Sequence, residues 1–320
     1  MPGLLKNAFR VHFGSLIFLI CCLGVLMTSI ISGVTHRADI PDVIIYNDYY
    51  KIYPFVAALI AVCVSAAFGI CPEFAYGTVK NKLIHGCSKL GFCISHLAAV
   101  LTECLIFCLL AYAPYRIIAH EKYFSLYSSE VLVRAFGLIF ASMLMISLLT
   151  FAVCITVRKT AFVLIVCAFL FLGLSWSADR LENELHLPVY TLENGQDDMI
   201  YHSETDSWEY VVIREPDKVP YPWYVDGVKR KVYYAAYVLN PMTCLKCGQD
   251  YLHKSDDCFT LEGREYFIEN HEYYNDTYIY NKEFERDYKL NNIYYPLWSG
   301  SLTLLLTVIG VLISRKRNIN

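Results

Sequence analysis

Six long apolar stretches dominate the sequence and limit what the chain can fold into. They cover residues 13–34, 52–72, 92–113, 131–157, 160–178 and 295–314. A helix needs about 20 apolar residues to cross the hydrocarbon core of a bilayer, and each stretch is close to or above that length. The low charged content, 18% of residues, agrees, because soluble domains average about 25%. We therefore predict an all-α polytopic membrane protein with six transmembrane helices.

Basic residues lie at alternate ends of these stretches. They are Lys6, Arg10, Lys80, Lys82, Lys89, Arg158, Lys159, Arg315, Lys316 and Arg317. Positive charge near the end of a span stays in the cytoplasm, so both termini are predicted to be cytoplasmic in a multi-pass protein of the cell membrane. The first stretch is too long for the apolar part of an ordinary signal peptide, which favours a span.

A long polar region separates the fifth and sixth stretches. Residues 178–295 carry 23 acidic and 12 basic side chains, which gives this region a net charge of -11. The whole chain has a net charge of -3, so the remaining residues carry +8. We predict a transmembrane part at 1–177, an extracytoplasmic α+β domain at 178–294 and a last span with a basic tail at 295–320. In the polar region, turn signals at Asn194-Gly195 and Asp226-Gly227 favour strands in the first half. An amphipathic helix should follow and end at Asn240-Pro241. The charge pattern gives no reason to expect nucleic acid as a partner.

The turn between the second and third stretches, residues 72–90, should form a short cytoplasmic helix. Proline lacks a backbone donor, so Pro72 is expected to end the preceding span, with Thr78 capping the new helix opposite Asn81. Gly86 should stop the helix, and Ser88 can cap the next one. We expect an apolar side made of Val79, Leu83 and Ile84, and a polar side made of Lys80, Asn81 and Lys82.

The same turn carries a family resemblance. The segments Glu73-Phe74, Gly77-Thr78-Val79-Lys80-Asn81-Lys82-Leu83 and Gly86-Cys87-Ser88-Lys89 resemble the E-[FY]-x-x-G-T-[IV]-[RK]-N-K-L-x-x-G-x-S-[RK] signature of ABC-2 type transporter permeases. The resemblance implies a coupling helix that docks on an ABC ATPase subunit, and a second permease copy or homologue beside this one. The coupling residues it implies are Glu73, Gly77, Thr78, Val79, Lys80, Asn81, Lys82, Leu83, Gly86, Ser88 and Lys89. The alternative is an ordinary amphipathic loop with basic residues near membrane lipid.

Several catalytic motifs are missing from the sequence. It has no Gly-x-x-x-x-Gly-Lys-[Ser/Thr] phosphate loop, so ATP and Mg are expected on a partner chain, and this chain is expected to have no cofactor and no enzymatic activity. The function predicted is the permease of an exporter for a peptide, drug or lipid-like substrate. A transport-inactive sensor or immunity subunit of the same build is the alternative. A membrane-embedded enzyme is less favoured, because the zinc-protease and serine-hydrolase motifs are missing too.

The third stretch contains two ionisable residues, His96 and Glu103. They lie seven residues apart, about two helical turns, and so share one face of the helix. A charge at mid-membrane costs about 2.5–3.5 kcal/mol on insertion scales, so this face should meet protein or a water-filled cavity. Two interpretations stay open: the pair lines a translocation path, or Glu103 is a protonated carboxyl bonded to another helix.

Cysteines in the polar region form an incomplete motif. Cys244-x-x-Cys247 is half of a zinc or redox motif, and Cys258 is the third cysteine of residues 178–295. Without a second cysteine pair or a histidine cluster, we expect no metal. A disulfide between two of the three cysteines and free thiols are both compatible with this spacing.

Overall fold

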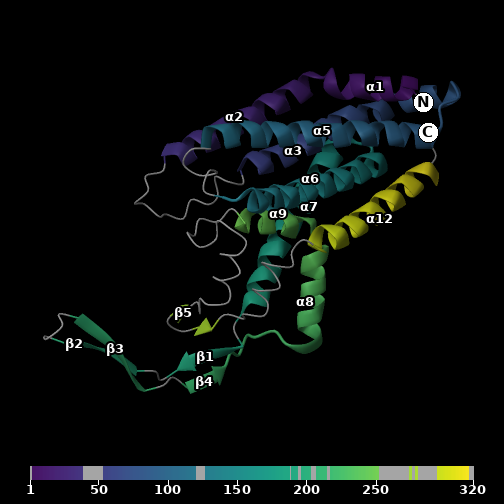
Figure 1. Cartoon of the computed structure of the whole chain (residues 1–320). Helices are drawn as coiled ribbons and strands as arrows, with labels where there is room; N and C mark the ends of the chain where they lie inside the picture. Colours follow the sequence, from purple (N-terminus) through teal and green to yellow (C-terminus); the bar gives the residue numbers. More distant parts are fainter. Residues whose placement is uncertain are drawn as a thin grey trace.

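The computed structural model describes residues 2–38, 53–119, 127–187, 189–193, 196–202, 207–214, 217–251, 274–275, 278–279 and 294–316. Helices dominate these residues (Figure 1). They are α1 (Pro2–Phe13), α2 (Leu16–Ala38), α3 (Tyr53–Ala75), α4 (Thr78–Ile84), α5 (Lys89–Ala119), α6 (Ser129–Val157), α7 (Thr160–His186), α8 (Gly227–Leu239), α9 (Pro241–Asp250) and α12 (Tyr295–Lys316). Six of them, α2, α3, α5, α6, α7 and α12, are long and apolar enough to cross a membrane, as predicted.

Two spans continue beyond the ends that were predicted for them at or next to a proline. Pro72 lies inside α3, which continues to Ala75, and Pro114 lies inside α5. A proline leaves only one carbonyl of the preceding turn without its donor, and the residues after it can stay helical. Accordingly, Tyr76 N–H still donates to the Pro72 carbonyl over 2.9 Å. The break comes at Gly77 instead.

The first apolar stretch is also divided differently. A turn at residues 14–15 separates the short helix α1 from the span α2, and Ser15 accepts a hydrogen bond from Phe18 N–H over 3.1 Å. α1 is amphipathic, with the apolar Ala8 buried and Arg10 exposed. It leads into α2 through a bend and lies along α5 and α3 (Figure 1).

The spans pack in two groups that meet at α3 and α6. α2, α3 and α5 form one group, and α6, α9 and α12 form the other, with α3 packed directly against α6 (Figure 1). α3 and α6 are the most buried spans, whereas α2, α7 and α12 expose large apolar side chains such as Leu19, Phe169 and Leu305. Such faces suit contact with lipid tails.

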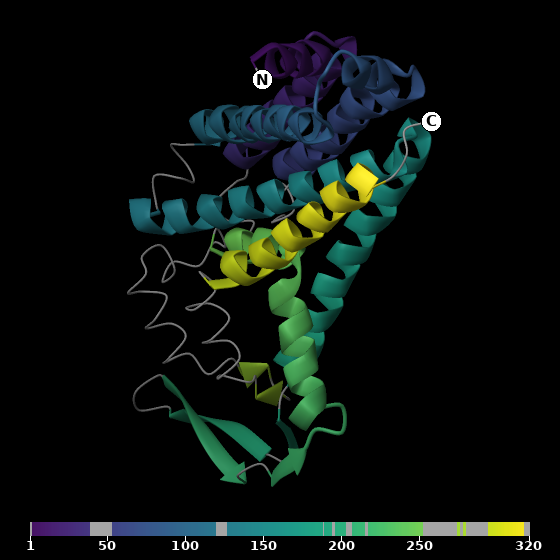
Figure 2. The ribbon, with the colours of Figure 1, turned by 90° about the vertical axis from the view of Figure 1, so that its right-hand side faces the viewer.

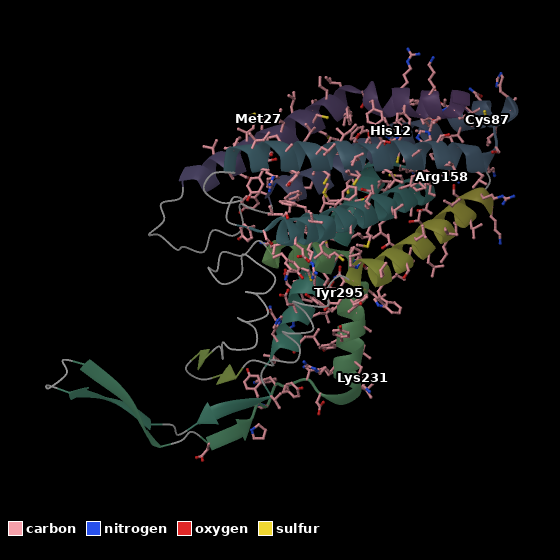
Figure 3. The ribbon with its side chains drawn as sticks, in the orientation of Figure 1. His12, Met27, Cys87, Arg158, Lys231 and Tyr295 are labelled. Carbon is pink, nitrogen blue, oxygen red and sulfur yellow. The ribbon has the colours of Figure 1, made fainter. Side chains whose placement is uncertain are left out.

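The turns that the basic residues mark come together at one end of the bundle. Lys89 Nζ donates to the Arg315 carbonyl over 3.1 Å, and Arg158 Nη2 donates to the Ser314 carbonyl over 3.3 Å. The Arg158 guanidinium also lies 4.9 Å from the centre of the Phe74 ring. Figure 3 places Cys87 and Arg158 at this same end, so the alternation of spans matches the predicted one.

The described residues after α7 do not support the predicted α+β insertion. α7 itself runs to His186, past the predicted end of the span, and α9 packs closely against α6. α8 lies beside the second half of α7 (Figure 2), where Arg230 Nη2 donates to the Leu185 carbonyl over 3.1 Å. These helices extend the transmembrane bundle, because their buried residues join the same core.

Strands are present in the described residues between α7 and α8, whereas Asp226-Gly227, which was also interpreted as a turn signal, starts α8. β1 (Tyr190–Glu193) and β4 (Asp217–Pro220) are antiparallel neighbours in a sheet of order β4-β1-β6-β5, completed by β5 (Tyr274–Asn275) and β6 (Tyr278–Ile279). β2 (Gln196–His202) and β3 (Ser207–Arg214) form an antiparallel pair in which Met199 faces Tyr210. The described part of the polar region's first half therefore contains four strands, β1 to β4.

The predicted amphipathic helix before Asn240-Pro241 is α8. It ends at Leu239 as expected, but the chain then starts α9 at once instead of leaving helical structure. Pro241 occupies the first position of α9, where a missing N–H costs nothing, and the Asn240 side chain accepts from Met242 N–H over 2.9 Å. Asn-Pro was interpreted only as a stop, although the same pair is a good helix start.

Candidate functional site

Two glycines delimit the short helix α4. Gly77 has φ +67°, a conformation that glycine adopts without strain, and its carbonyl accepts from Asn81 N–H over 3.1 Å. Gly86, at φ +86°, ends the helix, with Cys87 N–H donating to the Lys82 carbonyl over 3.1 Å. Thr78 was predicted as the cap, but Gly77 holds that position and no side chain caps the helix. Ser88 does cap α5, accepting from Gly91 N–H over 3.0 Å.

The two faces of α4 differ from the predicted ones. Val79 is buried and Leu83 packs against the core, as expected, but Ile84 is 72% exposed. Lys80 and Asn81 are exposed, whereas Lys82 is turned inward, with 17% of its side chain exposed. Residues three and four positions apart share a helix face, so Val79, Lys82 and Leu83 form one side and Ile84 falls on the other.

Lys82 binds a carboxylate at the end of α3. Its Nζ lies 2.7 Å from Glu73 Oε1 and 2.5 Å from Oε2. Glu73 is 6% exposed, so it is not part of a surface that another subunit could reach, although the resemblance named it as a coupling residue. Lys82 Nζ also lies 5.6 Å from the centre of the Phe92 ring on α5. α4 is thus attached to two spans through the side chain that was expected to face away.

Polar contacts continue from Glu73 into the bundle. His96 Nε2 lies 3.5 Å from Glu73 Oε2, and His96 Nδ1 lies 3.1 Å from His12 Nε2. His12 Nδ1 lies 3.1 Å from Glu103 Oε1, which also accepts from Ser65 Oγ over 2.5 Å. We call this set the buried polar path, and its members are Lys82, Glu73, His96, His12, Glu103 and Ser65. It crosses four helices, α4, α3, α5 and α1, and Figure 3 shows His12 where α1 lies along the spans.

A glycine makes room for the central histidine of the path. A Cβ atom at Gly69 of α3 would lie 2.7 Å from His12 Cε1 and 2.8 Å from both ring nitrogens. Real Cβ atoms essentially never come so close to a neighbour. The small residue on α3 therefore lets the His12 ring pass between α3 and α5.

The predicted pair His96 and Glu103 does share a buried face, but His12 was missed. The contacts of Glu103 with Ser65 of α3 and His12 of α1 are those of the structural interpretation, in which the carboxyl bonds to other helices. A role in a translocation path stays a prediction. A signal for His12 was present, since it follows Ala8 by four residues and so lies on the apolar face of α1.

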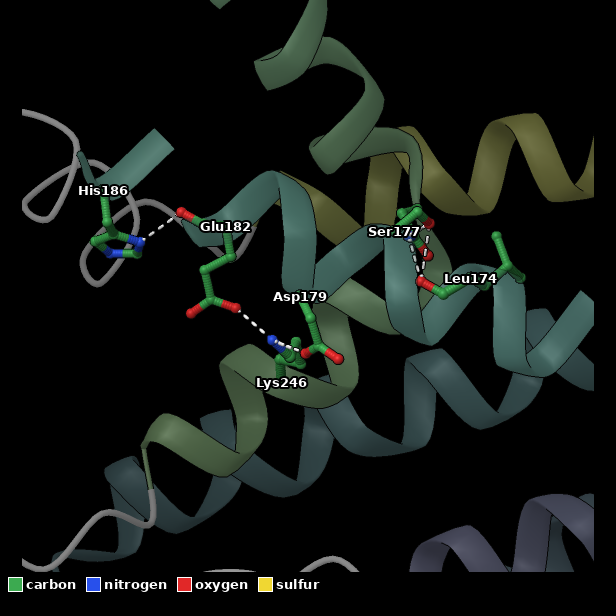
Figure 4. A network of polar contacts seen from close by, with 7 residues as sticks. Leu174, Ser177, Asp179, Glu182, His186 and Lys246 are labelled. Atoms are coloured by element: carbon green, nitrogen blue, oxygen red, sulfur yellow. Dashed lines mark hydrogen bonds and ion pairs between the residues drawn. The ribbon is translucent and has the colours of Figure 1, made fainter. Parts of the chain in front are cut away.

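A second polar network joins α9 to α7 (Figure 4). Lys246 Nζ lies 2.6 Å from Glu182 Oε2 and also pairs with Asp179, and Asn240 Nδ2 donates to the Leu174 carbonyl over 2.8 Å. Burial lowers the pKa of Lys246, but the nearby Glu182 and Asp179 raise it more, so the pKa lies above its usual value. This network fixes the joint between α8 and α9 to the outer half of α7.

Two of the three cysteines of the polar region lie in the described part of the chain. Cys244 and Cys247 are buried thiols on α9, and burial raises the pKa of Cys244 to about 12. Cys258 lies outside the described residues, so a disulfide or a metal site that includes it stays untested. Within the part of the chain that the structure describes, no group of three or more histidine, cysteine or acidic side chains could hold a metal ion.

Comparisons with protein-family models, with curated proteins and with solved structures give no match for this chain.

Proposed function

We propose that the chain is the permease subunit of an ATP-binding cassette transporter and that a separate ATPase subunit binds to α4. The observation that carries the proposal is the combination of the signature residues with the geometry of α4. The helix is delimited by Gly77 and Gly86, lies at the basic end of the bundle, and is attached to the spans through Lys82. A helix with this arrangement can transmit a displacement, caused by a partner that binds it, to the spans of the bundle.

The outer face of α4 suits a protein partner. Tyr76 is 83% exposed and Ile84 is 72% exposed, and between them Lys80 and Asn81 are also exposed. Aromatic and aliphatic side chains next to a basic residue are typical of a docking surface with an apolar centre. We assign this surface, made of Tyr76, Lys80, Asn81 and Ile84, to a groove on the ATPase with acidic groups at its rim.

The membrane orientation is part of the proposal. Basic residues gather at the end of the bundle that carries α4, which supports a cytoplasmic position for this end and for both termini. The strands β1–β4 and helix α8 then lie on the extracytoplasmic side. A second permease copy or homologue completes the complex, and the exported substrate is a peptide, drug or lipid-like molecule.

Transport follows from closure of the ATPase dimer. When ATP closes the motor, α4 is displaced, and the bond between Lys82 and Glu73 transmits the displacement to the end of α3. α3 is among the most buried spans and contacts α2, α5, α6 and α7, so a shift of its end changes the packing of the whole bundle. Packed bundles tend to switch between discrete arrangements, which gives inward-open and outward-open states.

The test is to purify the full chain from its native membranes and to measure the ATPase retained and its hydrolysis rate. Lys80→Glu should reduce retention at least about tenfold, because like charges facing each other across an interface cost several kcal/mol. Ile84→Asp should act in the same direction through lost apolar contact.

The matched control is Lys231→Glu, another exposed lysine, which lies on α8 far from α4 (Figure 3). This variant should retain the ATPase as the wild-type chain does. Absence of any nucleotide-hydrolysing partner, or equal retention in Lys80→Glu and Lys231→Glu, would overturn the proposal.

A further inference from the structure

Four ring nitrogens lie in a row between two carboxylates in the buried polar path. The row runs from Glu103 Oε1 to His12 Nδ1 at 3.1 Å, from His12 Nε2 to His96 Nδ1 at 3.1 Å, and from His96 Nε2 to Glu73 Oε2 at 3.5 Å. All four side chains are nearly excluded from solvent, with exposures between 0% and 6%. Each of the three contacts therefore needs a hydrogen between its two atoms.

Two neutral imidazoles cannot supply these hydrogens. A neutral ring carries one N–H and one acceptor nitrogen, and an ionised carboxylate only accepts. Two neutral histidines bring two hydrogens for three contacts, so one contact must be left with two acceptors facing each other. All three contacts can be hydrogen bonds only if one more proton is bound.

When both histidines donate toward Glu73, the contact left without a hydrogen is the one between His12 Nδ1 and Glu103 Oε1. In the described part of the chain, His12 Nδ1 at this contact lacks a hydrogen-bond partner, and so does Glu103 Oε2, the oxygen beside the Oε1 atom that His12 approaches. A proton on His12 Nδ1 fills this contact. The place where the hydrogen is missing is thus also the most buried part of the path, with both side chains 0% exposed.

The net charge of the buried polar path also indicates one bound proton. Ionised Glu73 and Glu103 together with the Lys82 cation give a net charge of -1 when both histidines are neutral. One bound proton makes the set neutral, and a second would make it positive. Because a net charge is costly to bury, the state with one proton is the favoured one.

Other titratable groups do not change this balance. Glu73 faces the histidines from α3, Lys82 from α4 and Glu103 from α5, and on α1 itself Arg10 is exposed. From α2, the thiols of Cys21 and Cys22 are near enough to Glu103 to interact with its charge, but as neutral thiols they add none. The Arg158 guanidinium of α6 is directed at the Phe74 ring and is held by the carbonyl of Ser314.

We propose that the buried polar path is a binding site for a single proton, which His12 and His96 share as one imidazolium beside the Glu103 carboxylate. The bound proton holds α1 against α3 and α5, and its loss leaves a buried negative charge beside Glu103 and releases His12 from its place next to Gly69. The proposal stands on the contacts alone and does not depend on the permease function.

The test is solid-state nitrogen-15 NMR of the full chain in lipid bilayers with labelled histidine. The chain has nine histidines, and the signals of His12 and His96 are assigned with His12→Gln and His96→Gln. Spectra are recorded over roughly pH 5 to 8, the range in which ordinary imidazoles change charge. We expect one imidazolium shared by His12 and His96 over most of this range, and never two.

Glu103→Gln is the decisive variant. An amide can donate its own N–H to His12 Nδ1, so the row is filled without the extra proton, and one bound proton per chain should be lost. His85→Gln removes an exposed histidine on the surface and should leave the His12 and His96 signals unchanged.

Two results would overturn the proposal. One is a pair of neutral rings at every pH in the wild-type chain, a result that needs no variant to fold. The other is an unchanged His12 and His96 spectrum in Glu103→Gln.

Discussion

Two lysine-centred networks hold the bundle together, and they differ in their contact with water. Lys82 pairs with Glu73, and their side chains are 17% and 6% exposed. Lys246 pairs with Asp179 and Glu182, and here Asp179 is 56% exposed and Lys246 is 26% exposed. The same kind of ion pair thus occurs once inside the bundle and once at its border.

This difference determines what each pair contributes. Exposed ion pairs are screened by water and contribute little, whereas a buried charge that loses its partner is strongly unfavourable. The Lys82 pair is also continued into the bundle through the ring nitrogens of two buried histidines, His96 and His12. We infer that the first network is used for coupling and the second for attaching α9 to α7.

The largest expected effect separates the two networks directly. Lys82→Met leaves Glu73 buried without its cation and should lower the free energy of unfolding by about 3–5 kcal/mol. Lys246→Met should cost at most about 1 kcal/mol, because its partners remain in contact with water. Unfolding in mixed detergent micelles measures both, and equal losses would remove the distinction between the networks.

The six spans could be predicted from the sequence because length and hydropathy alone decide them. The path could not, for two reasons. Lys82 was assigned to the outer face by its charge rather than by its position relative to Val79, and His12 was not among the predicted site residues. A long-range contact such as His12 to Glu103 depends on how α1 packs on the spans, which no local pattern specifies.

A second variant tests whether the buried network needs its close packing. Gly69→Ala places a methyl group within 2.8 Å of the His12 ring and should cost about 1–3 kcal/mol, because a packed core cannot absorb the added volume. Gly24→Ala on α2 is the matched control, since no atom lies within 4 Å of a Cβ at that site. It should be neutral or stabilising, and thermal unfolding of both variants checks this difference.

The smallest expected effect concerns the border network at high pH. The pKa of Lys246 is raised in the folded chain, so its stabilisation is fully present below the usual value of 10.5 and is lost as the pH rises through the higher folded value. Between about pH 9 and pH 12, wild-type stability should fall by at most about 1 kcal/mol more than that of Lys246→Met. Parallel unfolding series for these two proteins measure the difference, and identical slopes would contradict the assignment.

The inward attachment of α4 through Lys82 and Glu73 is the contact on which the proposed coupling most depends. A double-mutant cycle with Lys82→Met, Glu73→Gln and the combined variant measures this contact in unfolding experiments. Residues that do not touch are additive within about 0.3–0.5 kcal/mol, and we predict a coupling above about 1.5 kcal/mol for this pair. Additive losses would mean that Lys82 does not bind Glu73, and that α4 is not joined to the spans in the way described.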